Sequence, residues 1–148
     1  MSVRLAVRAV LLHRDRLLLV NAYPSARGSD LWCAPGGGVE AHQSLPGNLA
    51  REVMEETGLE VRVDDPCLVN EFHDPDRGFH QVEVFFRCRL RRGVLDDAHR
   101  DPEGVVDRRG WFTRAEMEAI RVKPSALSAV AWGDADAPRY DALERLVG

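Results

Sequence analysis

Three glutamates near the middle of the chain, Glu52, Glu55 and Glu56, lie side by side or three to four residues apart. On a helix, which advances about 100° per residue, their side chains fall within an arc of roughly 100°. Like charges placed in this way repel one another, and glutamates near the C-terminal end of a helix also oppose its dipole. One interpretation is a solvated polar face. The other is a cation site, because Mg²⁺ and Mn²⁺ prefer carboxylate oxygens.

Three consecutive glycines, Gly36 to Gly38, precede this acidic stretch. Without a Cβ, their backbone can approach a metal ion or a phosphate closely. A tight turn from a strand into a loop explains them as well, and both interpretations can hold together. No Gly-Lys-Ser or Gly-Lys-Thr follows, so the pattern is not that of a P-loop.

The whole segment resembles the Nudix box of the Nudix hydrolases. That pattern is Gly, any five residues, Glu, any seven, and then Arg-Glu-apolar-any-Glu-Glu-any-Gly-apolar. The matching positions are Gly37, Arg51, Glu52, Val53, Glu55, Glu56, Gly58 and Leu59. The resemblance implies an α/β fold, a Nudix-type α/β/α sandwich with a mixed β-sheet between helices, and a single domain over residues 1–148.

The resemblance also implies a chemistry. Nudix hydrolases cleave a nucleoside diphosphate linked to another moiety with the help of Mg²⁺ or Mn²⁺, so the substrate here would be a nucleoside triphosphate, a nucleotide sugar or ADP-ribose. The expected metal-binding residues are Glu52, Glu55, Glu56 and Gly37. The general base stays open among Glu52, Glu55 and Glu103, which lies in an acidic loop before Trp111.

Two arginines are candidate phosphate-binding residues. Arg27 lies in the polar loop "NAYPSARGSD", and Arg87 lies on the expected open face of a strand. The guanidinium group suits phosphate because its planar fork can donate two parallel hydrogen bonds.

Gln43 departs from the pattern, since the box has its first glutamate at that position. The resemblance implies that a glutamate at this position would pair with the box arginine, here Arg51. Gln43 can still accept a hydrogen bond from Arg51 but loses the charge-assisted part, and Glu40 is a nearby substitute. The departure motivates an alternative function, a non-catalytic Nudix-like module that binds or senses a nucleotide.

The elements that must position these residues follow from local patterns. A helix is expected over Leu45–Thr57, with Ser44 as its N-cap and Gly58 beyond its last turn. Thr113 and Glu116 have the spacing of a capping box that opens a second, short helix. Strands are expected over residues 3–11, 17–20, 59–72, 79–90 and 108–112, and helical segments over 125–132 and 140–147.

Composition excludes several classes of function. The formal net charge is -4, so no basic excess is available for an extended nucleic acid, and a small-molecule nucleotide is the expected partner. The first twenty residues interrupt their apolar runs with Arg4 and Arg8, which argues against a signal peptide and a membrane span. The oligomeric state stays open, with a homodimer as one arrangement.

The three cysteines, Cys33, Cys67 and Cys88, are widely spaced and include no CxxC pair. They are interpreted as small, buried, apolar residues of a protein in a reducing compartment. The cytoplasm is therefore the expected location.

Overall fold

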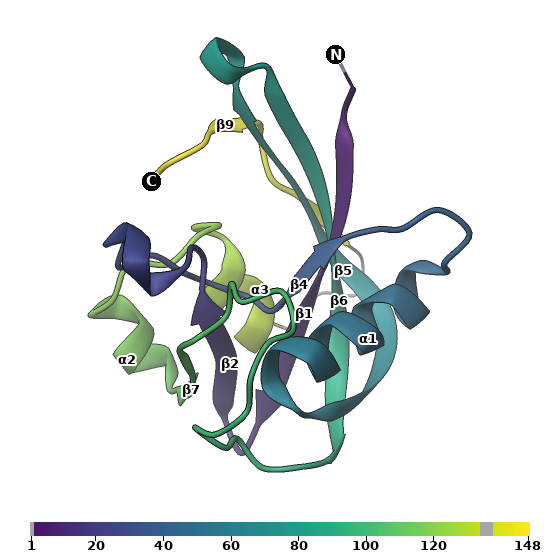
Figure 1. Ribbon diagram of the computed structural model, residues 1–148, viewed down its shortest axis with the longest axis vertical. Helices are drawn as coiled ribbons and strands as arrows, with labels where there is room; N and C mark the ends of the chain where they lie inside the picture. Colours follow the sequence, from purple (N-terminus) through teal and green to yellow (C-terminus); the bar gives the residue numbers. More distant parts are fainter. Residues whose placement is uncertain (1, 134–137) are drawn as a thin grey trace.

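The computed structural model describes residues 2–133 and 138–148 (Figure 1). Its centre is a mixed β-sheet with the strand order β3-β2-β1-β6-β5-β8, in which β4 pairs with β1, β7 with β2 and β9 with β5. The strands are β1 (Arg4–His13), β2 (Arg16–Asn21), β3 (Trp32–Cys33), β4 (Gly36–Gly38), β5 (Glu60–Asp74), β6 (Phe79–Arg92), β7 (Arg109–Phe112), β8 (Arg139–Tyr140) and β9 (Glu144–Arg145). The β1 strand runs antiparallel to β2 and parallel to β6.

Helices lie on both faces of this sheet, so the expected α/β class and layered arrangement are confirmed. The α1 helix (Leu45–Thr57) covers one face, while α2 (Arg114–Glu118) and α3 (Leu127–Trp132) lie on the other (Figure 1). Alternate residues of β1 enter different cores. Val7, Ala9 and Leu11 pack with residues of α1, and Val10 packs with residues of α3.

The α1 helix has the ends that the sequence predicts. The Ser44 hydroxyl accepts a hydrogen bond from the Gly47 backbone N–H at 3.1 Å, and Gly58 has a φ of 74° in the left-handed region. Pro46 lies in the first turn, where its missing N–H would have had no helical partner. Both ends are fixed by local chemistry, which holds the glutamates of this helix in register.

The glycines Gly36 to Gly38 form a strand and not a loop. As β4 they pair antiparallel with Ala6, Val7 and Arg8 of β1. Gly36 has a φ of 151°, and a Cβ there would lie 1.9 Å from the carbonyl oxygen of Val7. Any larger residue would therefore push β4 away from β1. The backbone next to the acidic helix is rigidly paired.

The long hairpin of β5 and β6 turns through a short 3₁₀ helix, η2 (Pro75–Arg77), within the predicted turn sequence "HDPDRG". Another 3₁₀ helix, η1 (Ser25–Arg27), lies in the polar loop after β2. The capping box of α2 is present, since Thr113 and Glu116 exchange hydrogen bonds. Among the described residues, no helix is both long enough and apolar enough to cross a membrane.

The helix expected over residues 140–147 is wrong. Part of this segment instead forms β8 and β9, which run parallel to β5 along its outer edge. The backbone N–H groups of Asp141 and Leu146 donate to the carbonyls of Val69 and His73, each at 2.8 Å. An isolated helix of this length is marginal in water, whereas an open strand edge offers hydrogen-bond partners at once. Part of the preceding stretch "GDADAP" lies outside the described residues.

Candidate functional site

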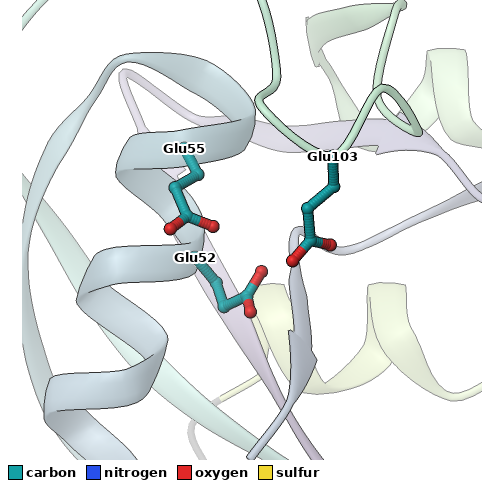
Figure 2. Close-up of side chains that lie close together, drawn as sticks. All are labelled: Glu52, Glu55 and Glu103. Carbon is teal, nitrogen blue, oxygen red and sulfur yellow. The ribbon is translucent and has the colours of Figure 1, made fainter.

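Three carboxylates from two separate segments meet beside α1. Glu52 and Glu55 extend from the helix, and Glu103 reaches them from the loop between β6 and β7 (Figure 2). One oxygen of each lies within 4.8 Å of the others. Glu52 is buried, Glu55 is partly buried and Glu103 is exposed, so the cluster opens toward solvent on the loop side.

The loop that delivers Glu103 is shaped by Asp101. Its carboxylate accepts hydrogen bonds from the backbone N–H groups of Glu103, Val105 and Val106, at 2.9 to 3.1 Å. The buried Asn21 at the end of β2 accepts two further backbone N–H groups, those of Asp107 and Arg108. These side chains fold the acidic loop back onto the sheet. Sequence reasoning missed them, although Asp and Asn are the residues that commonly build such turns.

The local electrostatics favour an added positive charge. Burial raises the pKa of Glu52, and the neighbouring Glu103 and Glu55 raise it further, against the opposing effects of Arg51 and Arg8. Three carboxylates that repel one another in a partly buried position present a set of hard oxygen donors, which fits Mg²⁺ or Mn²⁺.

The glycine strand is shaped around this cluster. A Cβ on Gly37 would lie 2.8 Å from an oxygen of the Glu52 carboxylate, so only glycine leaves the carboxylate its present position. Gly37 also lines the same cavity as Glu52 and Glu103. Its expected part in metal binding stays a prediction, now with a steric reason for the glycine.

Glu56 lies beside the three-carboxylate cluster and not within it. Its Oε1 accepts a hydrogen bond from the Gly36 N–H at 2.9 Å, which ties α1 to β4. Burial raises the pKa of Glu56 to about 8, although Arg8 and the Gly36 N–H favour the charged form. Its predicted role as a metal ligand remains a prediction, while the structure gives it a second role in joining helix and strand.

The raised pKa of Glu56 predicts a pH dependence of stability in metal-free protein. The folded state retains a proton that the unfolded chain releases above about pH 4.5, so the free energy of unfolding falls as the pH rises toward about 8. Glu56→Gln, which cannot ionise, should give a clearly smaller slope. Denaturant unfolding in a chelating buffer between about pH 5 and 8 measures this. Equal slopes for the two proteins would contradict the assignment.

Arg51 has other partners than the expected one. Its guanidinium contacts Glu55 at 3.0 Å, Glu52 at 3.4 Å and Glu40 at 3.6 Å. None of the contacts described for it involves the side chain of Gln43, which is exposed. The expected hydrogen bond from Arg51 to Gln43 is therefore wrong, and Glu40 provides the carboxylate from the loop.

The two candidate phosphate-binding arginines have different surroundings. Arg87 donates to the backbone carbonyls of Val130 and Gly133 at the C-terminal end of α3, at 2.9 and 3.4 Å, and lines neither of the two cavities described below. Its phosphate contact stays a prediction, although its Nη2 already donates to carbonyls at the end of α3. Arg27 lies over the ring of Tyr23, 4.9 Å from the ring centre, and lines a cavity.

Two neighbouring cavities meet at the sheet. The acidic cavity, of about 460 Å³, is lined by the glycine strand together with Glu52, Glu56 and Glu103. The large cavity, of about 620 Å³, is lined by residues that include Tyr23, Arg27, Phe79, Gln81 and Lys123. The residues that line both are Arg4, Arg8, Ala22 and Cys33. A molecule with a diphosphate at one end could therefore extend from one cavity into the other.

A buried ion pair stands at the boundary of the two cavities. Arg8 Nε donates to Glu83 Oε2 at 2.7 Å, and Arg8 Nη1 donates to the carbonyls of Ala34 and Gly36 at 3.2 and 3.3 Å. Burial alone would lower the pKa of Arg8, but the neighbouring Glu83, Cys33 and Glu56 together outweigh burial and keep the guanidinium charged. Gln81 and Glu83 are only 4% and 2% exposed, so the strand face that the sequence suggested was open is covered here.

The cysteines agree in part with expectation. Cys67 and Cys88 are buried, whereas Cys33 is partly buried at the boundary of the two cavities. Burial raises the pKa of the Cys33 thiol to about 12, so it stays protonated at neutral pH.

The chain matches a known protein family. A family model described as the NUDIX domain matches residues 3–133. Diphosphoinositol polyphosphate phosphohydrolase 2 of Rattus norvegicus is 35% identical over 98 residues, which cover 66% of this chain and 50% of that protein. The chain thus spans about half the length of that curated relative.

Solved structures share the fold. A MutT NUDIX hydrolase from Burkholderia pseudomallei superposes with a TM-score of 0.74 at 19% identity, covering 90% of this chain and all (100%) of that one. An ADP-ribose pyrophosphatase from Streptococcus suis gives a TM-score of 0.67 at 22% identity, covering 96% of this chain and 98% of that one. At such identities the likeness concerns the fold alone.

Proposed function

The chain belongs to the Nudix family, and from this premise we propose that it is a metal-dependent pyrophosphohydrolase. Its substrate would be a nucleoside diphosphate linked to another moiety, such as a nucleoside triphosphate, a nucleotide sugar or ADP-ribose. The observation that carries the proposal is the meeting of Glu52, Glu55 and Glu103, since Glu103 lies far from the helix in sequence and is still folded against it.

The proposed roles of the chain's own residues follow from their positions. Glu52 and Glu55 would hold Mg²⁺ or Mn²⁺, with Glu56 as a further acidic neighbour and Gly37 leaving room for the Glu52 carboxylate. The metal, when bound, would offset the negative charge of the diphosphate. Arg51 holds Glu52 and Glu55 in place from the side.

A general base must accept a proton from the attacking water, and the candidates are Glu52, Glu55 and Glu103. From the sequence, Glu103 ranks below Glu52 and Glu55 as a base, because acids in loops are more often only solvated. Its closeness to the two helix carboxylates supports it more strongly than the sequence did. The base remains one of these three in the proposal.

The proposal also covers the substrate partner and the cellular location. The fold neighbour described as an ADP-ribose pyrophosphatase supports a small-molecule nucleotide as the substrate. Cytoplasmic location and a single domain over residues 1–148 stay predictions, as does the homodimer. The free thiols of all three cysteines accord with a reducing compartment.

A substrate panel tests the proposal. Nucleoside triphosphates, nucleotide sugars, ADP-ribose and dinucleoside polyphosphates are each incubated with the protein, with Mg²⁺ and with a chelator, and products are identified by mass spectrometry. Turnover of at least one class only in the presence of metal is expected. No product from any class would count against hydrolysis and favour the alternative, a nucleotide-sensing module, provided that calorimetry then shows metal-assisted binding.

Gln43→Glu should change the rate little, by less than about threefold. The reason is that Glu40 already contacts Arg51 at 3.6 Å, while Gln43 is exposed and has no described contact with it, so a carboxylate at position 43 would add only a surface ion pair. Steady-state kinetics with the best panel substrate measures the effect. A tenfold rise in kcat on this substitution would show instead that the missing box glutamate limits catalysis.

A further inference from the structure

Arg4 and Arg8 occupy equivalent positions at the boundary of the two cavities. Both are on β1, and both line the acidic cavity and the large cavity. Four residues apart on a strand, their side chains leave the sheet on the same face. Any substrate that spans the two cavities must pass these two guanidinium groups.

Arg8 is already engaged with the protein through two of its three guanidinium nitrogens. Its Nε is bonded to Glu83, its charge is matched by that buried carboxylate, and its Nη1 is shared between the carbonyls of Ala34 and Gly36. It is a structural cation that joins β1, β4 and β6.

Arg4 differs in its pairing. Its Nη1 donates to Gln81 Oε1 at 2.5 Å, and no carboxylate lies within ion-pair distance of it in residues 2–133 and 138–148. A guanidinium group has five N–H donors, so most of those of Arg4 have no partner within the part of the chain that the structure describes. The side chain is also held close to the glycine strand, since a Cβ on Gly38 would lie 2.6 Å from Arg4 Nη2.

A chain of hydrogen bonds orients Arg4. Gln81 accepts from Arg4 and donates through Nε2 to Glu83 Oε2 at 3.0 Å, and Glu83 in turn is bonded to Arg8. The parallel register of β1 and β6 places Arg4 opposite Gln81 and Ala6 opposite Glu83, which makes this chain possible. The buried Glu83 accepts from the Gln81 amide nitrogen and so orients this amide. The amide oxygen of Gln81 then accepts from Arg4 and orients its guanidinium group.

We propose that Arg4 is a phosphate-binding residue that holds the substrate where it crosses from the acidic cavity into the large cavity. This rests on the proposed function, because it takes the phosphate from the same diphosphate substrate. A charged, multiply donating group without a carboxylate partner, oriented by a buried relay and placed on the path between two cavities, is suited to bind an anion. Gln81 is the positioning residue for it.

The test compares Arg4→Gln with a matched control, Arg91→Gln, which removes the same charge from an exposed arginine on β6 that lines neither cavity. ADP is titrated calorimetrically into wild type and both variants, with and without Mg²⁺. Arg4→Gln should weaken ADP binding roughly tenfold or more, the loss expected for one charge-assisted hydrogen bond, while Arg91→Gln binds as wild type does. Arg4→Lys should recover part of the loss.

Kinetics on the best panel substrate separates this role from a merely structural one. Arg4→Gln should raise KM by a similar factor with kcat changed less than about threefold, and with an unchanged unfolding midpoint. ADP affinity and KM within about twofold of wild type would overturn the inference even in an active enzyme, and so would an absence of ADP binding to wild type. Failure of the proposed function is a separate result, namely no turnover in the panel.

Discussion

Glu52→Gln is expected to lower the rate of hydrolysis by roughly three orders of magnitude while the protein stays folded. Loss of one carboxylate from the cluster removes a metal ligand, and a bound metal supplies several kcal/mol of transition-state stabilisation, at about 1.4 kcal/mol for each factor of ten. The substitution keeps the size and shape of a side chain that is only 5% exposed, so packing against Gly37 is retained. Initial rates at saturating Mg²⁺ measure the loss.

Stability measurements serve as the control for this variant. In metal-free protein, Glu52→Gln should unfold at the same temperature as wild type or slightly above it, because burial raises the pKa of Glu52 and Glu103 adds repulsion. Added Mg²⁺ should raise the wild-type unfolding temperature and have a smaller effect on the variant. Glu118→Gln, at an exposed position of α2, should match wild type in both rate and stability. A Glu52→Gln enzyme with more than a tenth of the wild-type rate would contradict the assignment.

Arg8→Met should destabilise the fold by roughly 3–5 kcal/mol. The loss arises because Glu83, only 2% exposed, would keep a buried charge without its partner. The carbonyls of Ala34 and Gly36 would also lose a donor. Denaturant unfolding at neutral pH gives the number.

A double variant distinguishes a lost ion pair from lost packing. Arg8→Met/Glu83→Leu removes both charges and should recover much of the stability, since apolar replacement of a whole buried pair is often neutral or favourable. The sum of the two single losses should therefore exceed the loss in the double variant. Additive losses, or an Arg8→Met protein within about 1 kcal/mol of wild type, would show that the pair contributes little.

Local signals in the sequence predict α1 and its glutamates well. Ser44, Pro46 and Gly58 set the ends of the helix through contacts a few residues long, and the apolar spacing sets its buried face. The same holds for the capping box at Thr113 and for the turn between β5 and β6. Such features need no knowledge of the rest of the chain, so the positions of Glu52 and Glu55 follow from sequence alone.

Contacts between segments that are distant in the sequence could not be predicted from local patterns. Gly36 to Gly38 form a strand because they pair with β1. Arg87 donates a hydrogen bond to a carbonyl of α3. Arg4 and Arg8 were read only as charges interrupting an apolar strand, because their partners on β6 are more than seventy residues away. The helix expected over 140–147 failed for the same reason, since the open edge of β5 competes for its backbone.

The rate of hydrolysis as a function of free Mg²⁺ tests the central claim most directly. Metal-stripped wild type is assayed with the best substrate of the panel while Mg²⁺ is added back from zero to saturation. The expected result is no measurable turnover without metal, a saturable return of activity, and a nucleotide product from cleavage within the diphosphate. Full activity in the presence of a chelator would contradict the assignment of Glu52, Glu55 and Glu103 as a metal-dependent hydrolytic site.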